Sequence, residues 1–269
     1  MENAPFDAYA PREIAARVEA LGVAKATTPL LSLVMLGVLA GAFIGLGALF
    51  SVIVFSDAGL GHAVQRALGG VVFSLGLVLV VVAGAELFTG NNLLAMAWAQ
   101  GVVTTKDLLC NWGLVCAANF AGAAGLALLV FLSGHADVYS RTYLEIAAAK
   151  SALPFWSAFF RGVLCNVLVC MAVWMTLAGR SVADKAVAIV FPISAFVAAG
   201  FEHSIANMYL FPLAAMLQAA AGEPVAVAWL WTNLVPVIAG NLVGGSVLVA
   251  LVYFVIYRRG VARWAGASP

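Results

Sequence analysis

The chain has 269 residues, of which 64% are hydrophobic and 9% are charged, and its formal net charge is +1. Soluble domains carry roughly 25% charged residues, so this composition, with a mean hydropathy of +1.06, indicates an integral membrane protein. The near-zero net charge also argues against a nucleic-acid-binding protein, which needs a basic surface to meet phosphates.

The uncharged windows are long enough for six membrane crossings, since a helix needs about 20 apolar residues to span a bilayer. Glu86 interrupts the second crossing, and Glu202 with His203 interrupts the fifth. We therefore predict an all-α membrane protein in which the second and fifth helices are broken. In chain order the windows are 26–56, 67–85 with 87–105, 108–134, 155–179, 186–201 with 204–222, and 225–257.

Residues 10–26, ahead of the first crossing, place Ile14, Val18 and Leu21 at helical spacing. This pattern predicts an amphipathic helix on the cytoplasmic membrane surface. Within the first crossing, Gly37, Gly41 and Gly45 form a small-residue face, which predicts close helix packing.

Lysine and arginine predict the orientation. With both termini in the cytoplasm, nine of the 13 lysines and arginines fall on the inner side. Cytoplasmic loops carry this excess in membrane proteins. We therefore expect a multi-pass protein of the cell (inner) membrane with both termini cytoplasmic.

The two broken segments resemble each other. GAELFTGNN (84–92) matches GFEHSIANM (200–208), and Asn119-x-x-Gly122 matches Asn241-x-x-Gly244. Three crossings in each half place the halves in opposite orientations, as in the inverted repeats of channels and transporters. We predict one channel domain, with a first repeat over 27–133 and a second over 154–258.

An unwound backbone inside a membrane is tolerated where it is buried in protein or lines a water-filled cavity. We expect Thr89, Gly90 and Asn91 to unwind the first broken helix, and Ser204 to be the N-cap of the new half-helix in the second. Helix N-termini near mid-membrane favour a small anion or its neutral acid.

His203 is the one histidine within a crossing, and an ionisable group there suggests function. It could donate a hydrogen bond or a proton to a passing carboxylate; alternatively, Glu202 or Asn207 satisfies it as a core residue. We expect Glu86 and Glu202 to accept hydrogen bonds at the breaks. Lys150 could be a solvated loop lysine or an anion attractor.

Other functional classes fit less well. A zinc protease would need a motif such as His-Glu-x-x-His, a haem anchor would need facing histidines, and a water or glycerol channel would carry Asn-Pro-Ala at the breaks. The four cysteines lie in apolar segments without metal-site spacing. We therefore expect no enzyme activity, no cofactor and no metal.

The segments GAELFTGNN and FEHSIANMY, with FSLGLVL before the first and GNLVGGSVLV in the last crossing, are similar to the formate/nitrite transporter family. The likeness runs from about residue 10 to residue 258 and is strongest to the formate-channel branch. It implies a homopentamer of aquaporin-like protomers in the lipid bilayer, each with its own pore.

The resemblance also implies the cargo and the pathway. The cargo would be a small monovalent anion, most plausibly formate, crossing as the neutral acid or with a proton; nitrite and hydrosulfide are the alternatives. His203 would be the central histidine and Thr89 the threonine of the first break. The remaining implied residues are the pore asparagines Asn166 and Asn241, the vestibule residue Lys150, an outer constriction at Phe73 and Val169, and an inner one at Leu77, Leu87 and Phe196.

Overall fold

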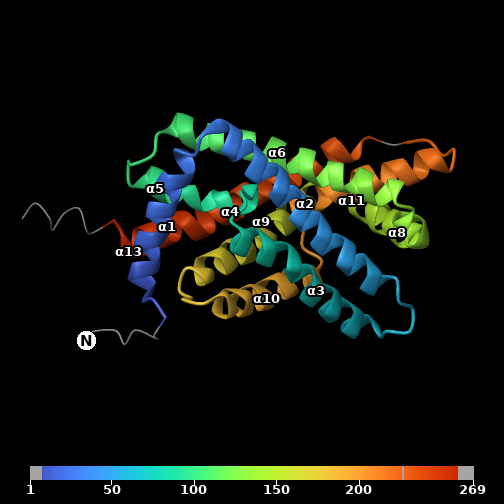
Figure 1. The fold of residues 1–269 in the computed structure, drawn as a ribbon, viewed down its shortest axis with the longest axis horizontal. Coiled ribbons are helices and arrows are strands. Elements are labelled where there is room, and N and C mark those ends of the chain that lie inside the picture. The colour runs from blue at the N-terminus through green and yellow to red at the C-terminus, as the bar shows by residue number, and fades with distance from the viewer. Residues whose placement is uncertain (1–7, 226, 260–269) are drawn as a thin grey trace, which may run out of the picture.

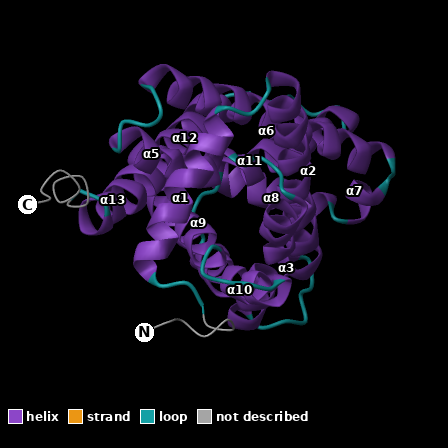
Figure 2. Ribbon diagram, turned by 60° about the vertical axis from the view of Figure 1, so that its left-hand side comes forward, coloured by secondary structure: helices purple, strands orange, loops and turns teal. Residues whose placement is uncertain are grey.

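In the computed structural model, residues 8–225 and 227–259 are described, and their regular secondary structure is helical throughout (Figures 1 and 2). The elements of the first half are α1 (Pro11–Ala26), α2 (Leu30–Phe55), α3 (His62–Ala83), α4 (Phe88–Asn91), the 3-10 turn η1 (Asn92–Leu94), α5 (Ala95–Ala99) and α6 (Thr105–Leu132). Those that follow are α7 (His135–Val138), α8 (Ser140–Ser151), α9 (Phe155–Thr176), α10 (Val182–Ala199), α11 (Ser204–Ala220), the π-helical segment η2 (Leu230–Leu234), α12 (Val235–Leu242), the π-helical segment η3 (Val243–Leu251) and α13 (Val252–Tyr257).

Six helical segments of the described chain are long and apolar enough to cross a membrane, which confirms the predicted all-α class with six crossings. They are α2, α3, α6, α9, α10 and the continuous run from Leu230 to Tyr257. Large apolar side chains such as Leu31, Phe191 and Trp231 are exposed on the surface of the chain. Such a surface suits lipid or a protein partner rather than water.

The chain leaves the helical conformation at two corresponding places, between α3 and α4 and between α10 and α11. Gly84 and Gly200 adopt left-handed conformations, with φ of 82° and 72°, and end α3 and α10. Glycine adopts this helix-ending conformation without the steric cost that a Cβ would add. Residues 84–87 and 200–203 are then non-helical.

The position of each interruption differs from the sequence prediction by a few residues. Thr89, Gly90 and Asn91 lie inside α4, so the unwound residues precede them. Ser204 is the first helical residue of α11, and His203 is its N-cap, accepting a hydrogen bond at Nδ1 from the Ala206 N–H at 3.2 Å. The glycine end-caps account for both shifts, because they stop the preceding helices earlier than the polar residues would.

Helix α2 packs against α3 and α6, and α9 packs against α10 and α12. The closest contact between α2 and α6 is at glycine: a Cβ on Gly41 would overlap the Asn119 carbonyl oxygen, and one on Gly122 would overlap that of Val38. Gly240 and Gly244 make the same kind of approach to Phe159 and Val163 of α9. Missing side chains therefore set the helix spacing in both halves.

Helices α1 and α8 lie at opposite ends of the molecule (Figure 1), α1 against α5 and η1 and α8 against α11. The apolar face predicted for α1 is covered by protein: Ile14 and Val18 are buried in a cluster with Met96 and Trp174. Leu21 is 36% exposed. Docking on neighbouring helices, rather than on lipid, therefore accounts for the pattern over residues 10–26.

Candidate functional site

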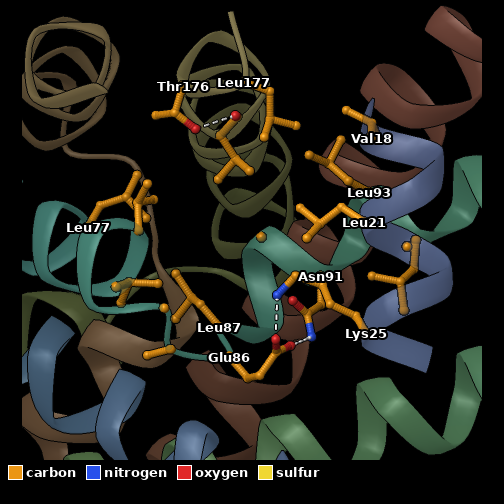
Figure 3. Close-up of a pocket in the computed structure, with 18 of the residues that line it drawn as sticks. Val18, Leu21, Lys25, Leu77, Glu86, Leu87, Asn91, Leu93, Thr176 and Leu177 are labelled. Carbon is orange, nitrogen blue, oxygen red and sulfur yellow. Dashed lines mark hydrogen bonds and ion pairs between the residues drawn. The ribbon is translucent and has the colours of Figure 1, made fainter. Parts of the chain in front are cut away.

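A closed ring of polar contacts surrounds Glu86 at the first interruption. Lys25 Nζ lies 2.7 Å from Glu86 Oε1, and Asn91 Nδ2 donates to Oε2 at 2.7 Å. Asn91 Nδ2 also donates to Asn111 Oδ1 at 2.9 Å, and Asn111 Nδ2 donates to the Lys25 carbonyl at 3.2 Å. Figure 3 shows Glu86, Asn91 and Lys25 at the wall of a cavity. The ammonium and amide groups compensate a carboxylate that is only 6% exposed.

The same ring recurs at the second interruption. Lys150 Nζ lies 2.9 Å from Glu202 Oε1, and Asn207 Nδ2 donates to Oε2 at 2.8 Å. Asn207 Nδ2 also donates to Asn233 Oδ1 at 2.7 Å, and Asn233 Nδ2 donates to the Lys150 carbonyl at 3.0 Å. The anion that Lys150 binds in this structure is therefore Glu202.

Sequence reasoning matched the glutamates but missed Lys25, Asn111 and Asn233. The sequence does contain a signal for Lys25: it lies in the last turn of the helix before the first crossing of its half, as Lys150 does in the second half. The two asparagines lie at different separations from their partners, 20 and 26 residues, and gave no common spacing to detect.

One further asparagine in each half, Asn119 or Asn241, makes hydrogen bonds to the backbone of the unwound segment. Asn119 Nδ2 donates to the carbonyls of Gly37 at 2.7 Å and Glu86 at 2.8 Å, while its Oδ1 accepts from the Phe88 N–H at 2.8 Å. These bonds satisfy backbone groups that the broken helix leaves without intrahelical partners.

Asn241, one of the predicted pore residues, repeats this arrangement. Its Nδ2 donates to the carbonyls of Gly162 at 2.8 Å and Glu202 at 3.0 Å, and its Oδ1 accepts from the Ser204 N–H at 3.0 Å. Both its amide N–H donors and its carbonyl oxygen are therefore engaged with the backbone, which makes Asn241 a scaffold group in this structure.

Two cavities approach the interruptions from opposite ends of α3. The Glu86-side cavity has a volume of about 260 Å³ and is lined by Leu77, Leu87 and Glu86 among others (Figure 3). The Glu202-side cavity has a volume of about 390 Å³, and its lining includes Phe73, Phe196 and His203. Phe73 and Leu77 are one helical turn apart, so about 6 Å of helix rise separates the two linings along α3.

His203 lies against two phenylalanine rings in the Glu202-side cavity. Its ring stacks on Phe196 with centroids 5.8 Å apart, and the Phe73 centroid is at 6.5 Å. Phe73 and Phe196 themselves make an edge-to-face contact at 5.5 Å. Phe196 thus shares a cavity with Phe73, whereas Leu77 and Leu87 line the other one.

The hydrogen bonds of His203 select one neutral tautomer. Its Nδ1 accepts from the Ala206 N–H, so the proton of a neutral ring is on Nε2. Nε2 lies 3.1 Å from the Thr89 hydroxyl of α4 and is therefore the donor to it. Protonating the ring would break the Ala206 bond, because Nδ1 would become a donor facing a donor.

Asn166 joins the two interruptions. Its Nδ2 lies 3.3 Å from the Thr89 carbonyl, 2.7 Å from Asn92 Oδ1 and 2.7 Å from the Asn241 carbonyl. Its Oδ1 is buried without a partner among the described residues. Val169, one turn farther along α9, is 1% exposed within the hydrophobic core. His203, Thr89, Asn166 and Asn241 thus form one contiguous polar group.

The comparisons with known proteins agree on one family. The family model for the formate/nitrite transporter matches residues 12–255. The formate channel FocA of Escherichia coli K12 is 38% identical over 275 residues, covering 95% of this chain and 96% of that protein. The formate channel BtFdhC of Bacillus thuringiensis is 35% identical over 266 residues, covering 93% and 96%.

Two solved structures share the fold. A structure described as a pentameric formate channel with formate bound superposes with a TM-score of 0.78 at 35% identity, covering 85% of this chain and 97% of that one. An FNT family ion channel superposes with a TM-score of 0.81 at 29% identity, covering 91% and 98%.

Proposed function

Because this chain belongs to the formate/nitrite transporter family, we propose that it is a membrane channel for formate, and that formate crosses as the neutral acid or together with a proton. Two relatives of similar length are named formate channels, and one structural neighbour is described with formate bound. The protein itself is a multi-pass membrane protein with no expected enzymatic step.

The observation that carries the mechanism is the pairing of His203 with Thr89 beside the two phenylalanine rings. A bare anion loses its hydration among these rings, which costs a large desolvation free energy. The Nε2–H of His203 and the Thr89 hydroxyl are the polar groups that can meet a carboxylate oxygen there. Formic acid, formed when the formate oxygen accepts a proton, would then pass Leu77 and Leu87 without a net charge.

His203 acts in this scheme through Nε2 alone. It donates a hydrogen bond from Nε2–H to the carboxylate and keeps that proton, because a neutral imidazole that lost it would become an imidazolate anion. The proton that converts formate into formic acid therefore comes from the aqueous solution, and the Nε2–H donor holds the carboxylate while that proton binds. The Nδ1 atom stays bound to the Ala206 N–H throughout. The helix dipole of α11 adds partial positive charge at this position.

We further propose that the protein is a homopentamer in the inner membrane with both termini cytoplasmic. The pentameric description of the structural neighbour and the exposed apolar side chains support the assembly. The distribution of lysine and arginine supports the orientation. The Glu202-side cavity then faces outward and the Glu86-side cavity faces the cytoplasm.

The test is flux into proteoliposomes that contain a pH-sensitive dye, with formate, nitrite, hydrosulfide and glycerol added in parallel. We expect formate to enter far faster than into empty liposomes and to acidify the interior. The variant His203→Asn keeps a helix N-cap acceptor but removes the imidazole Nε2–H donor beside Thr89. We expect it to lose most of the formate influx and therefore most of that acidification. Formate entry no faster than in empty liposomes would overturn the formate assignment, and the other three traces would then identify the cargo.

A further inference from the structure

We propose that Arg66 and Arg161 together bind the carboxylate of the permeating ion at the mouth of the Glu202-side cavity, before it reaches His203. This inference rests on the proposed function, because it assigns an entry site to the same cargo. It concerns residues outside the polar group at the two interruptions.

The two arginines come from different helices and converge on one place. Arg66 of α3 donates from Nε to the Ala198 carbonyl at 3.1 Å and from Nη2 to the Val197 carbonyl. Arg161 of α9 donates from Nη1 to the Gly200 carbonyl at 3.4 Å. Both side chains line the Glu202-side cavity, and both guanidinium groups lie near Gly200 at the end of α10.

Each guanidinium retains donors for a ligand. Arginine has five N–H donors in a planar fork that matches a carboxylate. Nη1 of Arg66, and Nε and Nη2 of Arg161, have no hydrogen-bond acceptor among the described residues. The Phe55 ring, 5.4 Å from the Arg66 guanidinium carbon, helps to hold that side chain in place.

The cavity holds two carboxylates, and both are already engaged. Glu202 is paired with Lys150 at 2.9 Å, and Glu145 is paired with Arg141 at 2.7 Å. Among the residues that the structure describes, neither Arg66 nor Arg161 has an ion-pair partner. The two histidines in the lining, His62 and His203, add no negative charge. A mobile anion is therefore the partner that these two cations lack.

The corresponding position in the other half carries no charge. The Glu86 N–H donates to the Leu36 carbonyl at 3.2 Å, and the Glu202 N–H donates to the Arg161 carbonyl at 3.3 Å, so Leu36 and Arg161 are equivalent. The repeated scaffold therefore folds with leucine at this place. This makes Arg161→Leu a substitution that the fold itself supports.

Capping of α10 is the other role that these side chains could have, since basic groups bind the last carbonyls of helices. The contact from Arg161 is long, and Arg161 is exposed. A cap would affect the stability of α10 and would leave the concentration dependence of transport unchanged. The two roles are therefore separable by experiment.

The experiment measures initial formate influx into proteoliposomes against formate concentration for wild type, Arg161→Leu, Arg161→Lys and Arg141→Gln. Arg141 lies on the same side of the protein, is 90% exposed and does not line the cavity. Because it pairs with Glu145 of the lining, Arg141→Gln is made and compared in a Glu145→Gln background, where it controls for general surface charge. We expect Arg161→Leu to raise the half-saturating concentration about three- to tenfold, which is the scale of one charge-assisted contact. Arg161→Lys should recover part of this loss, and Arg141→Gln should leave the value within about twofold.

Salt gives a second readout. Raising potassium chloride from about 10 mM to about 150 mM shortens the Debye length from about 30 Å to about 8 Å. The difference between wild type and Arg161→Leu should shrink accordingly. The arginine site would be overturned if Arg161→Leu had the half-saturating concentration and salt dependence of wild type, or if Arg141→Gln raised the half-saturating concentration as much as Arg161→Leu does. Either result would leave the formate channel intact.

Binding without transport separates this inference from the proposed function. Line broadening of ¹³C-labelled formate by the detergent-purified protein reports occupancy of the cavity mouth. Broadening that is lost in Arg161→Leu and kept in Arg141→Gln supports the site even if liposome flux fails. Equal broadening by all variants, or none by wild type, overturns it.

Discussion

Leu87 and His203 occupy the same place in the two halves. Each is the extended residue immediately before a half-helix, with φ and ψ of −108° and 122° for Leu87 and −107° and 114° for His203. The Leu87 side chain offers no acceptor to the N-terminal amides of α4, whereas the His203 side chain accepts from an amide of α11 through Nδ1. The two halves thus repeat the backbone conformation but differ in the side chain at this position, and only the second half carries a titratable group there.

Thr89→Val tests the contact between the halves. Valine keeps the shape of threonine but removes the acceptor for His203 Nε2–H, which leaves a buried donor unsatisfied at a cost of about 1–3 kcal/mol. We expect a folded protein with formate flux reduced at least several-fold, while Thr89→Ser retains most of the flux. Stopped-flow acidification measures both, and undiminished flux in Thr89→Val would show that the hydroxyl has no part in transport.

Lys25→Ala tests the paired rings of polar contacts. Removing the ammonium leaves Glu86 buried and unpaired, and breaking such a pair costs about 3–5 kcal/mol. Lys150→Ala should have a similar effect through Glu202. The thermal midpoint of the purified protein should fall in both variants, and Lys25→Ala with Glu86→Gln should recover part of the loss. A double variant no more stable than Lys25→Ala would contradict the pairing.

Asn119→Ala and Asn241→Ala should be about equally damaging. Each removes the partners of two backbone carbonyls and one backbone N–H in the membrane interior, and each stranded group costs on the order of 1–3 kcal/mol. We expect little folded protein from either variant when detergent extracts are examined by size exclusion. If Asn241→Ala folded normally and changed only conduction, its place as a scaffold group would be wrong.

Two glycines three residues apart on α6 give a matched pair for packing. A Cβ on Gly122 would overlap the Val38 carbonyl oxygen of α2, whereas one on Gly125 would meet nothing within 4 Å. Gly122→Ala should therefore separate α2 from α6 and lower the thermal midpoint strongly. Gly125→Ala should be neutral or stabilising by up to about 1 kcal/mol. Equal midpoints for the two variants would contradict the close approach.

The six crossings were predictable, because hydropathy acts locally along the chain. Single charges such as Glu86 indicated interruptions, which lie a few residues before the residues that we expected to unwind. The match between Glu86 and Glu202 was also visible, since each sits in a short recognisable segment. The lysine partners were not, because Lys25 and Glu86 are 61 residues apart and only the folded chain brings them together. The exact position of each interruption depends on Gly84 and Gly200, which adopt left-handed conformations and end α3 and α10. The polar residues that follow drew the sequence prediction a few residues too far along the chain.

The pairing of each lysine with its own glutamate also says where the chain divides. Lys25 with Glu86, and Lys150 with Glu202, each lie within one half only if the second half starts before α8 rather than at residue 154. A polypeptide cut between α6 and α7 would leave both ion pairs whole, while a cut just before α9 would strand Lys150 on the wrong fragment. Fragments from the first cut, expressed together, would be held by the contacts of α3 with α10 and α6 with α11. Helix α8 thus corresponds to α1, because each carries the lysine that pairs with the glutamate of the interruption that follows it.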